Sequence, residues 1–175
     1  LVGNPNTGKT SLFNHLTGLN QKVGNYPGVT VDKKQGTSTL SKSHKAIITD
    51  LPGTYSINPT SEDESIVFRT LFHKDFKEYP DVFVVVADVE NLKRNLLLFS
   101  QIKDLEIPTV LVINMVDLMQ KKGISIDVKM LEEELNTEVV LISARRNEGI
   151  DKVKEAIVRS HVAAKSLPMC DVNHK

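Results

Sequence analysis

The stretch Gly3-Asn4-Pro5-Asn6-Thr7-Gly8-Lys9-Thr10, near the start of the chain, decides the fold because it matches the pattern G-x-x-x-x-G-K-[ST]. Glycines in such a loop let backbone N–H groups surround phosphate oxygens, and the helix that follows adds its positive end. Leu1–Val2 resemble the end of a strand, and Lys9–Leu16 have the character of a helix. A glycine-rich turn with this pattern between a strand and a helix predicts a phosphate-binding loop (P-loop).

Two side chains of this loop have specific expected roles. Lys9 is expected to reach the β- and γ-phosphates of a nucleotide, and the Thr10 hydroxyl to ligate Mg²⁺. The residues expected to contact the nucleotide here are Gly3, Asn4, Pro5, Asn6, Thr7, Gly8, Lys9, Thr10 and Ser11.

Outside the loop, apolar strand-like runs alternate with stretches of helical period. Strands are expected at Gln35–Leu40, Lys45–Leu51, Val82–Ala87, Thr109–Ile113 and Val139–Ile142, with residues 20–34 as a polar loop. Helices are expected at 9–16, 61–73, 92–102, 127–135 and 150–157. This alternation predicts right-handed crossovers and a mostly parallel sheet flanked by helices, which is a three-layer α/β fold.

The length of 175 residues suits one domain, expected at 1–163, with 164–175 as a tail or linker stub toward a further region. Because the chain opens on Leu1–Val2 without a Met, the first strand is expected to be truncated at its start. Lys plus Arg and Asp plus Glu both number 22, which argues against a nucleic-acid partner. The single cysteine and the short apolar runs indicate a soluble domain in a reducing compartment.

A second phosphate-binding loop is expected at residues 50–55, which read DLPGTY. Asp50 ends a strand, and its carboxylate is expected to hold Mg²⁺ through water, with Leu51 and Pro52 beside the nucleotide. The Gly53 N–H is expected to meet the γ-phosphate. Many related switches place a glutamine next, which orients the attacking water, but Thr54 is too short for that task.

The base is expected to bind at Asn114-Met115-Val116-Asp117, which follows a buried strand. A carboxylate at Asp117 accepts two hydrogen bonds from guanine N1–H and N2–H₂, and adenine offers no such pair. Asn114 is expected to tie this loop to the P-loop, and Ser143-Ala144-Arg145 to complete the pocket with a backbone N–H. In this order behind two phosphate loops, the residues predict GTP or GDP.

Thr30 lies in the polar stretch Gly24-Asn25-Tyr26-Pro27-Gly28-Val29-Thr30. A hydroxyl there completes the Mg²⁺ shell only when the γ-phosphate is present, with Gly28 and Val29 beside it. This loop is therefore expected to order with GTP and to loosen with GDP.

With these loops assigned, the sequence resembles the translation-factor-like GTPases, and most closely the G domain of the ferrous iron transport protein B family. The resemblance covers about residues 1–160 and is carried by GNPNTGKTSLFN (3–14), VGNYPGVTVDKK (23–34), TDLPGTYS (49–56), NMVD (114–117) and SAR (143–145). It implies a Ras-like P-loop GTPase fold at the cytoplasmic face of a bacterial inner membrane. It also implies a helical domain and a membrane permease domain elsewhere in the full-length chain, and allows a homo-oligomer.

The resemblance further implies a substitute for the missing glutamine. Some family members resemble K⁺-activated GTPases, in which a K⁺ ion neutralises the charge that develops between the β- and γ-phosphates. The asparagine that would ligate this ion matches Asn6, and the backbone carbonyls match Gly24 and Tyr26. The expected catalytic residues are then Asn6, Lys9, Thr30 and Gly53.

Together these features predict Mg²⁺-dependent hydrolysis of GTP, faster with K⁺, that gates or regulates Fe²⁺ uptake. The iron part rests wholly on the resemblance. Two alternatives stay open. One is a soluble GTPase in RNA or ribosome assembly, which predicts a basic patch or an RNA-binding module. The other is a nucleotide-binding switch with negligible hydrolysis, in which Thr54 means loss of catalysis.

Overall fold

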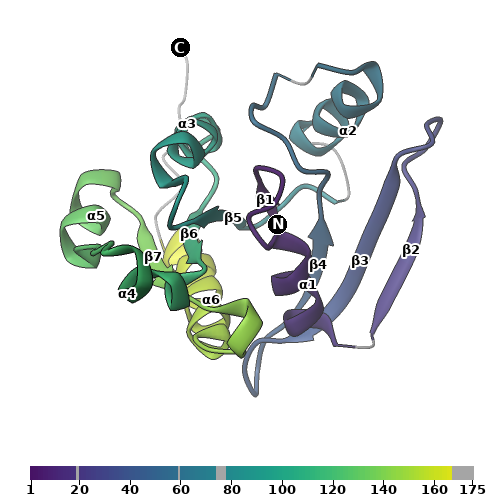
Figure 1. The fold of residues 1–175 in the computed structure, drawn as a ribbon. Coiled ribbons are helices and arrows are strands. Elements are labelled where there is room, and N and C mark those ends of the chain that lie inside the picture. The colour runs from purple at the N-terminus through teal and green to yellow at the C-terminus, as the bar shows by residue number, and fades with distance from the viewer. Residues whose placement is uncertain (19, 59, 74–77, 167–175) are drawn as a thin grey trace, which may run out of the picture.

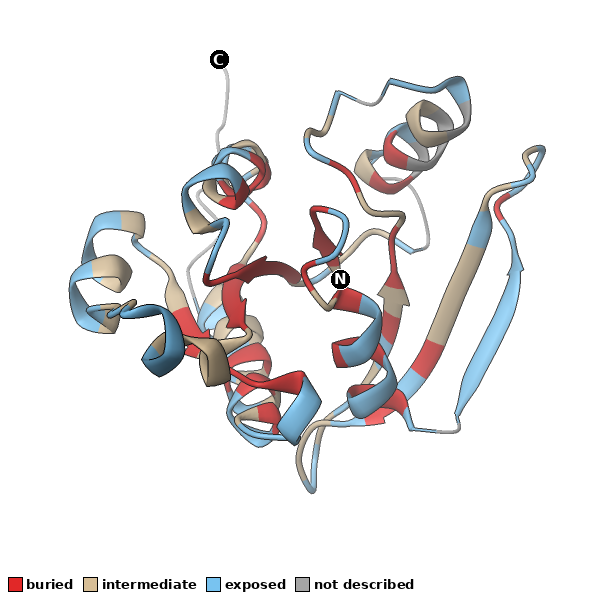
Figure 2. Ribbon diagram, in the orientation of Figure 1, coloured by how far each residue is buried: buried red, intermediate tan, exposed pale blue. Residues whose placement is uncertain are grey.

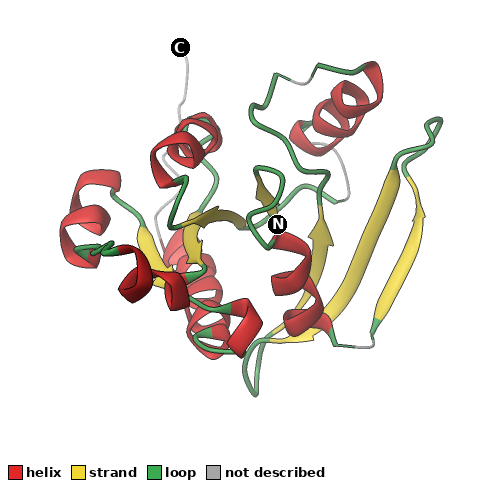
Figure 3. Cartoon of the chain, viewed as in Figure 1, coloured by secondary structure: helices red, strands yellow, loops and turns green. Residues whose placement is uncertain are grey.

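The computed structural model describes residues 1–18, 20–58, 60–73 and 78–166. The elements follow one another along the chain as Figure 1 labels them, and Figure 3 distinguishes helices from strands. Their bounds are β1 (Val2–Gly3), α1 (Lys9–Thr17), β2 (Gln21–Asn25), β3 (Asp32–Thr39), β4 (Lys45–Asp50), α2 (Glu62–Phe72), β5 (Phe83–Asp88), α3 (Leu92–Lys103), β6 (Thr109–Asn114), the 3-10 helix η1 (Val116–Leu118), α4 (Met119–Lys122), α5 (Val128–Leu135), β7 (Glu138–Leu141), the 3-10 helix η2 (Ala144–Arg146) and α6 (Ile150–Ser166).

Within the described residues the strands form two sheets that adjoin at β1. Strands β1, β5, β6 and β7 are parallel in the order β1-β5-β6-β7, and β2, β3 and β4 are antiparallel in sequence order. The Leu51 N–H donates to the Leu1 carbonyl at 3.1 Å, and the Leu1 nitrogen donates to the Thr49 carbonyl at 2.6 Å. In a parallel pair of strands, one residue bonds to two residues of the neighbouring strand that are two positions apart, as Leu1 does with Thr49 and Leu51. The P-loop therefore leaves a central strand, between β4 and β5.

Helices cover both faces of the parallel sheet. Alternate residues of each strand point to opposite faces, and apolar residues on both faces pack against helices. On one face Val85 and Ile113 pack with Leu98 of α3 and Phe68 of α2. On the other face Val112 packs with residues of α1 and α6. Figure 2 shows the buried residues along β5 and β6 and on the inward sides of these helices. The expected three-layer α/β fold is thus confirmed.

Residues 20–34 differ from the expected loop. Strand β2 occupies 21–25, and β3 begins at Asp32. Every residue of β2 is exposed, so the strand shows no apolar alternation that a sequence pattern would reveal. The antiparallel ladder with β3 holds it instead, with Val23 opposite Lys34.

The last helix also differs from expectation, because α6 continues to Ser166. Residues 164–166, expected as the start of a tail, therefore belong to this helix. No glycine or proline interrupts residues 150–166, so the sequence allows the helix to continue. The rest of the expected tail, 167–175, lies outside the described residues. In the part of the chain that the structure describes, no helix combines the length and apolar character that crossing a membrane requires.

Candidate functional site

The P-loop wraps tightly between β1 and α1. Asn6 and Gly8 both have left-handed backbone conformations, with φ of 65° and 85°. A Cβ on Gly8 would lie 2.1 Å from the Asn114 side-chain nitrogen, so glycine is required there by both conformation and space. The Thr7 hydroxyl donates to the Asn4 carbonyl at 3.0 Å and closes the turn.

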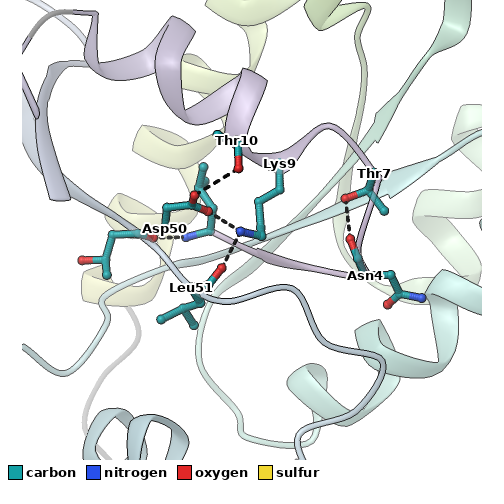
Figure 4. Close-up of polar contacts among 8 residues, drawn as sticks. Asn4, Thr7, Lys9, Thr10, Asp50 and Leu51 are labelled. Carbon is teal, nitrogen blue, oxygen red and sulfur yellow. Dashed lines mark hydrogen bonds and ion pairs between the residues drawn. The ribbon is translucent and has the colours of Figure 1, made fainter. Parts of the chain in front are cut away.

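Lys9 and Asp50 meet behind this loop, as Figure 4 shows. The Lys9 ammonium donates to the Asp50 carboxylate and to the Leu51 carbonyl. Both side chains are buried, with Lys9 8% and Asp50 6% exposed, so each charge needs its partner. An incoming phosphate that reaches Lys9 must therefore take over as the partner of the ammonium.

Thr10 and Asp50 provide oxygen atoms at the same point. The Thr10 hydroxyl donates to the second Asp50 carboxylate oxygen at 3.4 Å. A hydroxyl and a carboxylate are the hard oxygen donors that Mg²⁺ takes, so these two residues fit the ion. Thr30 is exposed in the turn between β2 and β3, and among the described residues no hydrogen bond links it to Thr10 or Asp50. The structure thus brings together two of the three expected Mg²⁺ ligands.

The segment after Asp50 lies against the P-loop. A Cβ on Gly53 would lie 3.3 Å from Pro5, and the Thr54 N–H donates to the Gly3 carbonyl at 3.1 Å. The Thr54 hydroxyl donates to the Ser56 carbonyl at 2.7 Å and accepts from the Ser56 N–H at 3.3 Å. Thr54 is also buried, at 6% exposed. Its hydroxyl serves this local turn and does not replace a glutamine.

Asn114 connects three loops. Its side-chain nitrogen donates to the Thr7 carbonyl at 3.0 Å, and its side-chain oxygen accepts from the Ala144 N–H at 2.9 Å. The expected tie between the base loop and the P-loop is present. One backbone N–H of Ser143-Ala144-Arg145 was expected to complete the base pocket, and the Ala144 N–H is bonded to Asn114 in this conformation.

Asp117 is held by the neighbouring loop. The Ser143 hydroxyl donates to the Asp117 carboxylate at 2.8 Å. This hydrogen bond is the main cause that lowers the pKa of the Asp117 carboxyl, burial acts against it, and the charges of Arg146 and Arg145 add to the lowering. The carboxylate is therefore ionised near neutral pH and accepts hydrogen bonds, as guanine recognition requires.

The three residues expected at a K⁺ site are not brought together. Gly24 lies in β2 opposite Lys33, and the Tyr26 carbonyl accepts from the Val29 N–H at 3.3 Å. With Gly28 at φ 78°, this is a tight turn at the tip of the β2–β3 hairpin. Strands β3 and β4 separate β2 from the P-loop, where Asn6 is exposed (Figure 1). In this conformation these groups do not form a cation site.

Sequence reasoning named Asn4 but missed Asp88 and Asn95, which line the same cavity beside the P-loop. Asn4 is 3% exposed, and neither polar atom of its amide has a partner among the described residues. It lines a cavity of about 170 Å³ together with residues of the β5–α3 junction. There the Asp88 N–H donates to the Asn95 side chain at 2.9 Å. The position of Asp88 at the end of β5 was the available signal, since ligands gather at that edge.

A P-loop after β1, an Asp-x-x-Gly segment after β4 and two joined loops after β6 and β7 define a G domain of the P-loop class. The chain belongs to the ferrous iron transport protein B family, whose model matches residues 1–157. The family inferred from the sequence motifs is therefore confirmed.

Known relatives agree with this membership. The Fe(2+) transporter FeoB of Leptospira biflexa is 47% identical over 154 residues, covering 88% of this chain and 22% of that protein. The cytosolic domain of the T. maritima FeoB iron transporter in its GMPPNP form has a TM-score of 0.82 at 41% identity, covering 90% of this chain and 61% of that one. An S. thermophilus NFeoB mutant bound to GDP has a TM-score of 0.81 at 40% identity, covering 91% and 59%. The chain spans about a fifth of the length of the curated relatives it matches.

Proposed function

We propose that this chain binds GTP and hydrolyses it to GDP and phosphate as part of a bacterial ferrous iron transporter. The observation that carries the proposal is the convergence of Lys9, Thr10 and Asp50 beside a base loop tied to the P-loop by Asn114. The GDP and GMPPNP forms of the solved relatives support the choice of nucleotide.

In the proposed binding step, Lys9 exchanges its contacts with Asp50 and Leu51 for the β- and γ-phosphates. The released Asp50 carboxylate, through water, and the Thr10 hydroxyl would hold Mg²⁺. A bound Mg²⁺ neutralises phosphate charge and orients the phosphate chain. The Asp117 carboxylate accepts from the guanine edge, and the Ser143 hydroxyl favours its ionised form.

In the proposed hydrolytic step, backbone groups orient the attacking water. Thr54 has no side chain long enough, and its hydroxyl is already bonded to Ser56. Among the described residues the Gly53 N–H has no hydrogen-bond partner, so it is free to donate to the γ-phosphate. Thr30 and the neighbouring Val29 backbone join this site only after the turn at the tip of the β2–β3 hairpin moves.

For the whole protein, we propose that hydrolysis gates or regulates Fe²⁺ uptake through a membrane permease part of the same longer chain. This domain would then lie at the cytoplasmic face of the bacterial inner membrane. The support is membership of the family and the transporter identity of its relatives.

We also propose that K⁺ accelerates hydrolysis through Asn6. The support is that Asn6 is exposed in the P-loop with a left-handed backbone and that Thr54 cannot supply a glutamine-like function. The Tyr26 carbonyl accepts one hydrogen bond, from the Val29 N–H, and its second lone pair is the one that a cation site with Asn6 would use.

Phosphate release from GTP, measured in KCl and in NaCl at equal ionic strength, tests both proposals. We expect a rate at least about tenfold higher in K⁺, below the gain that an arginine finger provides. The Asn6→Ala variant should lose the K⁺ gain. The control Asn14→Ala should keep it, because Asn14 is exposed on α1 and its side chain bonds Gln21.

Three outcomes are informative. Equal and substantial rates in both salts would overturn the K⁺ proposal alone. Near-zero rates in both, with GDP binding intact, would overturn hydrolysis and leave a nucleotide-binding switch. A K⁺ gain that survives Asn6→Ala would remove Asn6 from the cation site.

A further inference from the structure

Helix α3 holds the segment that follows Gly53. The side-chain oxygen of Gln101 accepts from the Ser56 hydroxyl at 2.9 Å and from the Ile57 N–H at 3.0 Å. The Ser56 hydroxyl in turn accepts from the Asn58 N–H at 3.1 Å. A single amide oxygen thus orders three consecutive residues of this segment.

A second contact from the same helix holds the preceding residue. The Arg94 guanidinium lies 4.1 Å from the centre of the Tyr55 ring, which is a cation–π distance. Arg94 and Gln101 are seven positions apart, about two helical turns, so they lie on one face of α3. Leu98 and Ile102 are fully buried against the sheet and fix the helix that carries them.

The other end of the segment is tied to the P-loop. The Thr54 N–H donates to the Gly3 carbonyl, and Gly53 lies against Pro5. Gly53 is therefore placed between the P-loop and the α3 contacts. Because no long side chain follows Gly53, the placement of its backbone N–H depends on these two attachments.

We infer that Gln101 is a positioning residue for hydrolysis: through Ser56 and Ile57 it holds the Gly53 backbone where the γ-phosphate arrives. This inference rests on the GTPase function proposed above. Gln101 is not one of the residues proposed to contact the nucleotide, so its loss should lower kcat and leave nucleotide affinity nearly unchanged. Misplacement of a reacting geometry by a fraction of an ångström reduces rate far more than binding.

Two substitutions separate this role from simple packing. Both hydrogen bonds use the Gln101 oxygen as acceptor, so Gln101→Glu keeps them. Gln101→Met has a similar length and no comparable acceptor. The matched control is Ser100→Ala, one position away, where the exposed hydroxyl bonds only the Leu97 carbonyl of its own helix among the described residues.

The first readout is amide hydrogen exchange at Ile57 and Asn58 in nucleotide-free protein, which does not depend on hydrolysis. Gln101→Met should raise exchange there roughly two- to tenfold, the factor expected for one hydrogen bond. The second readout is phosphate release. Gln101→Met should lower kcat by about ten- to a hundredfold, with KM and GDP affinity within about twofold. Gln101→Glu should keep both the exchange rates and kcat near their wild-type values, and Ser100→Ala should change neither.

Unchanged exchange in Gln101→Met would overturn the inference, as would faster exchange with an unchanged kcat. A wild-type protein without hydrolysis would overturn the proposed function, and the exchange result would still decide whether Gln101 anchors the segment. If Gln101→Met unfolds, Ser56→Ala removes the same hydroxyl contact from the other side. It should raise exchange at Asn58 and lower kcat, and failure of both would overturn the inference.

Discussion

At the scale of the residue, one hydroxyl favours the ionised form of the proposed guanine contact. The Ser143 hydroxyl is the main cause that lowers the pKa of the Asp117 carboxyl below its ordinary value of 3.8. A carboxyl whose pKa is lowered in the folded state contributes its full stabilisation of that state at pH values above its ordinary pKa. Its contribution is lost as the pH falls through the folded-state pKa.

We predict that Ser143→Ala shifts the acid limit of guanine nucleotide binding to higher pH. Wild-type protein should keep its affinity for a fluorescent GDP analogue to a lower pH than the variant, because the Ser143 hydroxyl favours the ionised form of Asp117. In Ser143→Ala the affinity should begin to fall at a higher pH. Ser166→Ala, on an exposed helix end, is the control. Equal acid limits in all three proteins would exclude this role of Ser143.

The same scale shows where sequence patterns succeed and fail. The tie between the base loop and the P-loop was expected from the local motif at Asn114, and the structure shows it as a hydrogen bond to Thr7. The phosphate contact expected of Lys9 stays a prediction, and in this structure Lys9 pairs with Asp50. Gln101 carries no such signal. It looks like any polar residue on a helix, and its partners Ser56 and Ile57 come from a loop 44–45 positions away.

At the scale of the element, Gly36 determines how β3 packs on α1. A Cβ at this position would lie 2.5 Å from the Thr17 methyl and 2.7 Å from the Asn20 carbonyl. At Gly24 in the neighbouring strand β2, a Cβ would meet nothing within 4 Å. The two glycines belong to the same hairpin, but only Gly36 has neighbouring atoms where a Cβ would lie.

We predict that Gly36→Ala destabilises the domain by about 1–3 kcal/mol, because the α1 contact must move to admit a methyl group. Gly24→Ala should change stability by less than about 0.5 kcal/mol. Urea unfolding followed by circular dichroism measures both. Equal effects of the two substitutions would contradict this packing.

Elements with an apolar pattern were predictable, and β2 was not. Strands β5 and β6 are buried at every position and appear as continuous apolar runs. Strand β2 is exposed at every position, so only its ladder with β3 makes it a strand. That ladder also leads into the turn that holds the Tyr26 carbonyl and Thr30 between β2 and β3.

At the scale of the whole molecule, Asn114 links loops that follow β1, β6 and β7 into one site. A ligand that binds across these loops binds only the native state, and its binding energy adds to the stability of the whole domain. At one hundred times the dissociation constant this gain is about 2.7 kcal/mol.

We therefore predict that saturating GDP with Mg²⁺ raises the unfolding midpoint by about 5–10 °C in a thermal shift experiment. ADP at the same concentration should give almost no shift, because adenine lacks the donor pair for Asp117. Asp117→Ala should lose the GDP shift. Similar shifts with GDP and ADP would rule out the proposed base contact.

The sequence by itself determined the P-loop, the strand-end motifs and the order of the layers. These features depend on backbone conformation and burial within a few residues, and glycines and apolar runs encode them locally. Only the tertiary structure decided the edge strand β2, the closed Tyr26–Val29 turn and the hold of α3 on residues 55–57. The reason is that a polar side chain finds its partner in space, and no local pattern records which distant loop arrives beside it.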